Sequence, residues 1–155
     1  MQNKKGIEPV IATVLLIVIT IAAVALIIAF VVPFVQNQLA TADLCYKANG
    51  IQLDPSATCY NPTNGNLTLK IVWSGNEALN LTKIRVSISN PTTTKTLVLD
   101  VNNIPKNPGE EQTTVIPATV HNVVNVTTVS IAPVLKPAKG NEITCDIRSI
   151  PINPC

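Results

Sequence analysis

The chain has 155 residues and a formal net charge of +2; 46% of its residues are apolar and 13% are charged. So small a charge argues against nucleic-acid binding, and one Trp, two Tyr and two Phe offer little surface for stacking on bases. The length suits one compact domain plus one additional element.

The first element is a long apolar run over residues 10–35, in which only Thr13, Thr20 and Pro33 are not plainly apolar. About 26 residues form a helix of about 39 Å, whereas a bilayer core needs about 20 residues. A helix that is apolar on every face requires apolar surroundings on every face, unlike the helix of a soluble domain. The run therefore predicts a membrane-inserted helix.

Lys4 and Lys5 precede this run, and the next basic residue is Lys47. The positive-inside rule then places the N-terminus in the cytoplasm and the chain after residue 40 outside the cell. An ordinary secretory signal, cleaved after Ala42, is the alternative, but its apolar core would span only about 7–15 residues.

The stretch Lys4-Lys5-Gly6, followed by Ile7-Glu8-Pro9 and the apolar run, resembles the class III signal of archaeal type IV pilins and their archaellin relatives. The resemblance covers roughly residues 4–30. It implies that a prepilin peptidase cuts between Gly6 and Ile7. The expected parts are a leader (1–6), a hydrophobic N-terminal helix (7–42) and an extracellular β-sandwich domain (43–155).

The family resemblance also implies a role for the helix in assembly. Ala22, Ala25 and Ala29 would let identical helices approach closely, although membrane spans in general are rich in alanine. Bacterial pilins carry a glutamate at the fifth mature position, where this chain has Ile11; its acid, Glu8, is the second mature residue. Glu8 either meets a neighbour's terminal amine or simply starts the helix, and we favour the latter.

After Asp43 the sequence changes to short alternating stretches separated by turn-forming residues. "NLTLKIVW" places Leu67, Leu69, Ile71 and Trp73 on one face, and "KIRVSIS" does the same for Ile84, Val86 and Ile88. About seven such strands predict an antiparallel β-sandwich. The family resemblance implies an immunoglobulin-like head. The expected fold class is thus α+β, with a long N-terminal hydrophobic α-helix followed by this head.

The four cysteines, Cys45, Cys59, Cys145 and Cys155, all follow the apolar run, which fits disulfide formation outside the cell. They allow three connectivities. Pairing nearest neighbours requires the least chain organisation, whereas cross-pairing would tie the first segment of the head to its last. We expect nearest-neighbour pairing, Cys45 with Cys59 and Cys145 with Cys155.

Three sequons, at Asn66, Asn80 and Asn125, are candidate N-glycosylation sites. The chain has no phosphate loop, no dinucleotide-binding glycine motif and no cluster of residues with metal-ligand spacing. The adjacent Glu110 and Glu111 indicate a solvated loop, and the single histidine, His121, has no catalytic partner nearby in sequence. We therefore expect no enzyme activity, no cofactor, no metal and no catalytic residues.

The expected function is that of a pilin: a structural subunit that polymerises through its N-terminal helix into a cell-surface filament for adhesion. Its partners would be copies of itself, the prepilin peptidase and the pilus assembly machinery, with the cytoplasmic membrane holding it before assembly. One alternative is an archaellin-type motility subunit. Another is a membrane-anchored extracellular binding protein, which predicts a ligand groove with exposed aromatic residues; Trp73 is expected to be buried.

Overall fold

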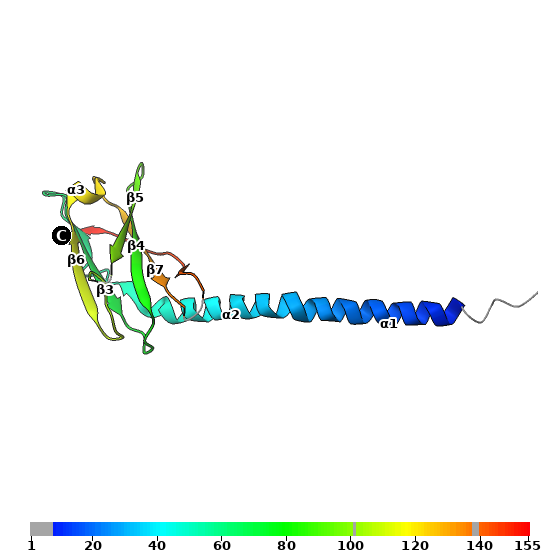
Figure 1. The fold of residues 1–155 in the computed structure, drawn as a ribbon. Helices are drawn as coiled ribbons and strands as arrows, with labels where there is room; N and C mark the ends of the chain where they lie inside the picture. Colours follow the sequence, from blue (N-terminus) through cyan, green and yellow to red (C-terminus); the bar gives the residue numbers. More distant parts are fainter. Residues whose placement is uncertain (1–7, 101, 138–139) are drawn as a thin grey trace, which may run out of the picture. The chain divides into compact units, whose positions relative to one another are not determined.

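A computed structural model describes residues 8–100, 102–137 and 140–155. The chain divides into two compact units, Met1–Ala42 and Asp43–Cys155. A long, apolar N-terminal helix is followed by two mostly antiparallel sheets, so the expected α+β class is confirmed (Figure 1).

The N-terminal helix consists of α1 (Glu8–Leu26), a π-helical turn η2 (Ile27–Val31) and α2 (Val32–Lys47). Its large apolar side chains from Val10 to Leu39 are between 42% and 69% exposed. The two threonines are satisfied within the helix, because the hydroxyls of Thr13 and Thr20 donate to Val10 O at 2.9 Å and Ile17 O at 2.8 Å. Lipid-like surroundings would therefore meet no unpaired hydroxyl at these two positions.

Pro33 is the second residue after the π-helical turn, and the ribbon passes through this region without a break (Figure 1). Proline has no N–H, and its ring clashes with the carbonyl four residues earlier in a regular α-helix. Here the N–H of Val32 instead bonds Ile27 O, five residues back. This wider turn provides the room that the proline ring needs, so Pro33 is accommodated by a π-bulge.

The first sheet is built around β3 (Leu67–Trp73). β6 (Glu111–Ile116) pairs antiparallel with β3 along one edge. On the other edge, β1 (Ile51–Leu53) pairs with the Trp73 end and β2 (Cys59–Tyr60) with the Leu67 end. β10 (Asn153–Pro154) then adds to β2 as a parallel strand.

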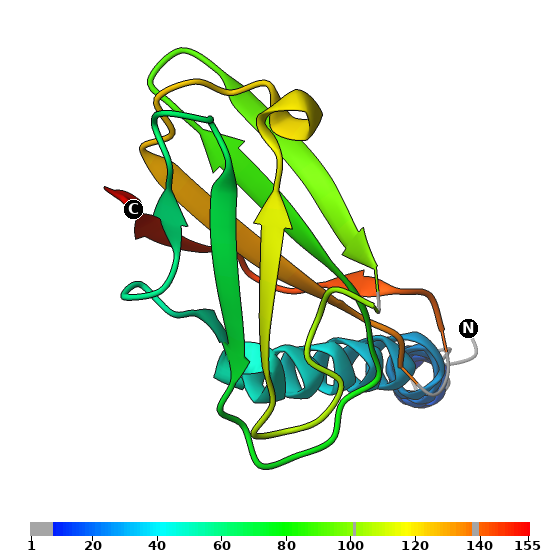
Figure 2. The same ribbon diagram turned by 90° about the vertical axis from the view of Figure 1, so that its left-hand side faces the viewer.

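The second sheet has β4 (Leu81–Ser89) and β7 (Thr128–Leu135) at its centre. β5 (Thr94–Asp100) pairs with the free edge of β4, while β9 (Arg148–Pro151) and β8 (Ile143–Thr144) pair with successive parts of β7. Figure 2 shows β3 and β6 as one layer in front of β4, β5 and β7.

Pro133 lies inside the central strand β7, a position that a proline normally cannot occupy because it lacks a ladder N–H. Its carbonyl accepts the N–H of Cys145 at 2.9 Å, so its nitrogen faces the same side. On that side the partner of β7 changes from β9, which pairs up to Ile131, to β8, which pairs from Val134. The missing donor therefore falls at the junction between two partner strands.

The buried faces of the two sheets contribute to one core cluster. The alternating burial expected from the sequence is confirmed on two strands. From β3 the buried side chains are Leu67, Leu69, Ile71 and Trp73, and from β4 they are Ile84, Val86 and Ile88. Val129 and Ile131 of β7 complete the centre of this cluster.

The described residues form ten strands, compared with the seven or so expected. Three of them, β2, β8 and β10, are only two residues long. Two short helical segments, η3 (Ala48–Gly50) and α3 (Ala118–His121), complete the head. Strands this short carry no alternation of their own, so the sequence pattern cannot reveal them.

The expected nearest-neighbour pairing of the cysteines is wrong. Cys45 is bonded to Cys145 and Cys59 to Cys155, with Cα atoms 5.2 and 5.0 Å apart. The parallel pairing of β10 with β2 places Asn153 opposite Cys59 and brings Cys155 beside it. Pairing of the strands therefore already brings these distant cysteines together. The chain organisation that cross-pairing requires comes from the sheet itself.

Candidate functional site

The expected peptidase site, Lys4, Lys5, Gly6 and Ile7, lies outside the described residues, as does the side chain of Glu8. Glu8 is the first residue of α1. Ala22, Ala25 and Ala29 are all exposed on the N-terminal helix. By length and composition, this helix could cross a membrane.

The three sequons differ in accessibility. Asn80 is exposed directly before β4, and Asn125 is exposed in the loop before β7 with a backbone φ of 51°. Asn66 is half-buried, and its Oδ1 accepts the N–H of Ala118 at 3.3 Å. Asn80 and Asn125 therefore offer their amides to solvent more fully than Asn66 does.

His121 is 1% exposed and belongs to the interior of the head. The backbone N–H of Val123 donates to its Nδ1 at 3.1 Å, so the ring hydrogen must lie on Nε2, which donates to Gly65 O at 3.0 Å. Both ring nitrogens are thus used in joining the loop before β3 to the loop after α3. The arrangement makes His121 a structural residue with no free nitrogen.

Two clusters of charge lie at the surface of the head. The ammonium group of Lys70 is 2.7 Å from a carboxylate oxygen of Glu111 and 3.4 Å from one of Asp54. Lys47 is similarly placed between Glu77 at 2.9 Å and Asp43 at 3.1 Å. The hydrogen bond that Lys70 donates to Glu111 raises the pKa of Lys70, and the one that Lys47 donates to Glu77 raises the pKa of Lys47. Both lysines keep their charge and link separate segments of the head.

Glu110 and Glu111, expected to form a solvated loop, are exposed but differ in role. Glu110 precedes β6, where its carboxylate accepts the side-chain amide of Asn107 at 2.6 Å and the backbone N–H of Lys106 at 2.8 Å. These bonds, with that from Asn107 the strongest, lower the pKa of Glu110. Glu111 begins β6 and binds Lys70. Both carboxylates therefore stabilise neighbouring segments of the head.

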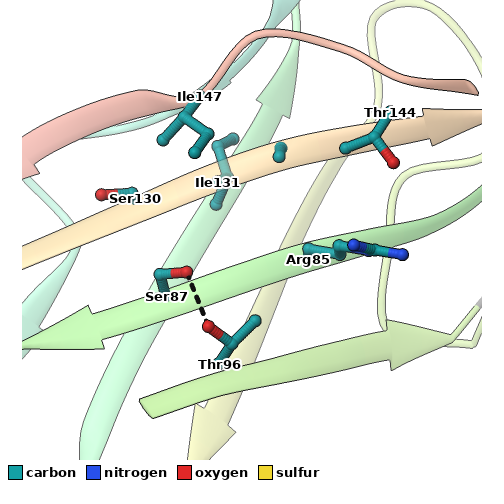
Figure 3. A pocket seen from close by; sticks show the side chains of 8 residues that line it. Arg85, Ser87, Thr96, Ser130, Ile131, Thr144 and Ile147 are labelled. Carbon is teal, nitrogen blue, oxygen red and sulfur yellow. Dashed lines mark hydrogen bonds between the residues drawn. The ribbon is translucent and has the colours of Figure 1, made fainter. Parts of the chain in front are cut away.

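A groove of about 230 Å³ lies on the face of the second sheet that is turned away from the core. We call it the sheet-face groove; it is lined mainly by Arg85, Ser87, Thr96, Ser130, Thr144 and Ile147. Figure 3 shows Ile147 near β7, with Arg85 and Thr144 toward one end of the groove and the Ser87–Thr96 hydrogen bond toward the other. Ala132, 5% exposed, also lines it.

Only part of this groove has a signal in the sequence. Alternation in β4 places Arg85 and Ser87 opposite the buried Ile84, Val86 and Ile88. The remaining lining comes from β5, β7 and the segment between β8 and β9, and only the strand register brings these residues together. The groove as a whole therefore has no signature in the sequence alone.

Within the described ranges, no three His, Cys, Asp or Glu side chains are grouped so that they could hold a metal ion. Comparisons with protein-family models, curated proteins and solved structures find no match to this chain.

Proposed function

We propose that this chain is a pilin: a structural subunit that polymerises through its N-terminal helix into a cell-surface filament of the archaeal type IV class, for adhesion. Before assembly the same helix would hold the subunit in the cytoplasmic membrane. The proposal includes removal of residues 1–6 by a prepilin peptidase and an extracellular head of immunoglobulin-like architecture.

The observation that carries this proposal is the exposure of the N-terminal helix. Its large apolar side chains over residues 10–39 are exposed in the described part of the helix. Burying apolar surface gains about 25 cal/mol per Å², so such a helix is stable only in lipid or among other apolar helices. A bundle of identical helices meets that requirement once the subunit has left the bilayer.

The head supports the same proposal through its construction. Two mostly antiparallel sheets enclose one core, as in a sandwich, and two disulfides cross-link its first and last segments. Disulfides persist in oxidising surroundings outside the cytoplasm. The parallel β2–β10 pair departs from a purely antiparallel sandwich, so the immunoglobulin-like character that we propose concerns architecture alone.

The decisive test is Ala25→Lys compared with Thr94→Lys. Ala25 lies in the apolar helix, where a lysine costs roughly 2.5–3.5 kcal/mol at the bilayer centre and would have no partner among packed helices. Thr94 is exposed at the start of β5, so the same charge there should be tolerated. We expect filaments from Thr94→Lys and none from Ala25→Lys, as judged by electron microscopy of sheared surface material.

Protease protection must first show that Ala25→Lys reaches the membrane and exposes its head. Normal filaments from that variant would refute the proposal and favour a membrane-anchored binding protein. Swimming that depends on intact filaments would instead favour the archaellin-type subunit.

Processing has its own test. N-terminal sequencing of the mature protein should begin at Ile7, and Gly6→Val should accumulate as uncut precursor, because the peptidase is expected to accept a residue without side-chain bulk. A mature protein beginning at Met1 or Asp43 would contradict this part of the proposal.

A further inference from the structure

Arg85 lines the sheet-face groove and has no acidic partner there. In contrast, Lys47, Lys70 and Lys83 each lie within 3.4 Å of at least one carboxylate. Within the part of the chain that the structure describes, no carboxylate lies within 4.0 Å of the Arg85 guanidinium. A guanidinium presents a planar fork of donors that matches a carboxylate in two parallel hydrogen bonds.

A row of hydroxyl groups crosses the sheet next to Arg85. The register aligns Thr96, Ser87, Ser130 and Ser149 on four neighbouring strands. Thr96 and Ser87 are hydrogen-bonded at 3.0 Å, and Ser130 and Ser149 at 2.8 Å. Each hydroxyl donates once and accepts twice, so every member of the row can still bond a polar ligand.

One wall of the sheet-face groove is apolar and is fixed in position. Ile147 is 66% exposed and lines the groove. Two residues earlier, Cys145 is buried, bonded to Cys45, and donates its N–H to Pro133 O at 2.9 Å. The disulfide and this hydrogen bond hold the segment that carries Ile147 against β7.

We propose that the sheet-face groove binds the carboxylate-bearing ring of a sugar acid, such as a uronic acid unit of a glycan. Arg85 pairs with the carboxylate, the hydroxyl row bonds the ring hydroxyls, and Ile147 covers the apolar C–H face of the ring. The volume of about 230 Å³ lies below the roughly 300–1,000 Å³ of drug-sized sites, which suits a single ring. The proposal concerns the head alone and does not depend on filament assembly.

The surrounding charges favour a singly charged ligand over a doubly charged one. Next to Arg85 along β4 is Lys83, whose ammonium lies 2.8 Å from Glu142 and whose register partner on β5 is Asp100. Lys136, whose charge helps to lower the pKa of Glu142, brings the net charge of these neighbours to zero. A phosphate dianion would therefore find only one guanidinium and no further net positive charge, whereas Arg85 alone matches the single charge of a carboxylate.

The test uses the full-length protein in detergent micelles and saturation-transfer NMR with glucuronate, glucose and glucose 6-phosphate as probes. We expect transfer to glucuronate and none to glucose. Arg85→Gln should weaken glucuronate binding about tenfold or more, because a hydrogen-bonded ion pair is lost. Thr96→Val, which keeps the side-chain shape without the hydroxyl, should weaken it less. Lys95→Gln is the matched control, since this exposed cation on β5 does not line the groove.

Each other result would overturn the proposal. Absence of transfer to glucuronate, equal transfer to glucose, or full binding by Arg85→Gln would show that the groove does not recognise a sugar acid. Tighter binding of glucose 6-phosphate would show a site for phosphate instead. Unchanged Trp73 fluorescence confirms that each variant is folded, because this single tryptophan is fully buried in the core.

Discussion

Removing the two disulfides one at a time and then together should reveal how strongly they are coupled. The perturbations are the double variant Cys45→Ala/Cys145→Ala, the double variant Cys59→Ala/Cys155→Ala, and the variant that lacks all four cysteines. The two bridges close overlapping loops with sequence separations of 100 and 96. Because the loops overlap, their contributions to the free energy of unfolding are not independent.

The magnitude follows from the entropy of the unfolded chain. A single bridge that closes a loop of about 100 residues raises the free energy of unfolding by about 4.7 kcal/mol. With that bridge present, the shortest path between the other two cysteines crosses it and spans only about 24 residues: about 14 from Cys45 to Cys59 and about 10 from Cys145 to Cys155. The second bridge then adds about 3.5 kcal/mol.

Loss of either bridge alone should therefore cost about 3.5 kcal/mol, and loss of both about 8 kcal/mol. Since domains are typically stable by about 5–15 kcal/mol, the head without both bridges should be close to unfolding or unfolded. The assay is guanidinium unfolding of the full-length protein in detergent, followed by the fluorescence of Trp73.

One of these variants, compared with a further double variant, tests the connectivity. Cys45→Ala/Cys145→Ala should contain no alkylatable thiol, whereas Cys45→Ala/Cys59→Ala should contain two. A single proteolytic cut between residues 60 and 144 should also leave the two fragments joined until a reductant is added. Fragments that separate without reductant would show nearest-neighbour pairing and refute the reasoning.

Two further substitutions probe the interior of the head in the same unfolding assay. His121→Phe keeps most of the side-chain volume but leaves Val123 N–H and Gly65 O without their partner. The free energy of unfolding should therefore fall by about 1–3 kcal/mol. An unchanged unfolding midpoint would show that these hydrogen bonds do not contribute to stability. Gly50→Ala would place its Cβ 2.5 Å from Gly75 N and should cost at least about 2 kcal/mol. At Gly109 an added Cβ would meet open space, so only the φ of 85° opposes Gly109→Ala, at a cost of about 1 kcal/mol. Equal losses of stability in Gly50→Ala and Gly109→Ala would contradict the steric explanation.

The parts of the fold that could be predicted are those whose signal lies in neighbouring residues. The apolar run predicts the helix, and period-two alternation predicts β3 and β4 with their buried faces. Thr13 and Thr20 each bond a carbonyl of their own helix, as expected for isolated polar residues in an apolar run.

The parts that could not be predicted depend on which distant segments meet. The β2–β10 pair joins residues near both ends of the head, and with it the disulfide Cys59–Cys155. The sheet-face groove requires the register of β4 with both β5 and β7. The burial of His121 depends on Gly65, which lies far away in sequence but supplies the acceptor for Nε2.

The overlapping disulfides also define how the head would respond to mechanical tension. Without cross-links, a chain pulled between Cys45 and Cys155 could extend over about 110 residues, or roughly 360–400 Å. With the bridge between Cys45 and Cys145, the shortest covalent path to Cys155 crosses the sulfur atoms and then only about ten residues, or roughly 35 Å. A subunit held by its helix and pulled at the C-terminal end of its head would therefore resist as a short tether, even after its sheets had separated.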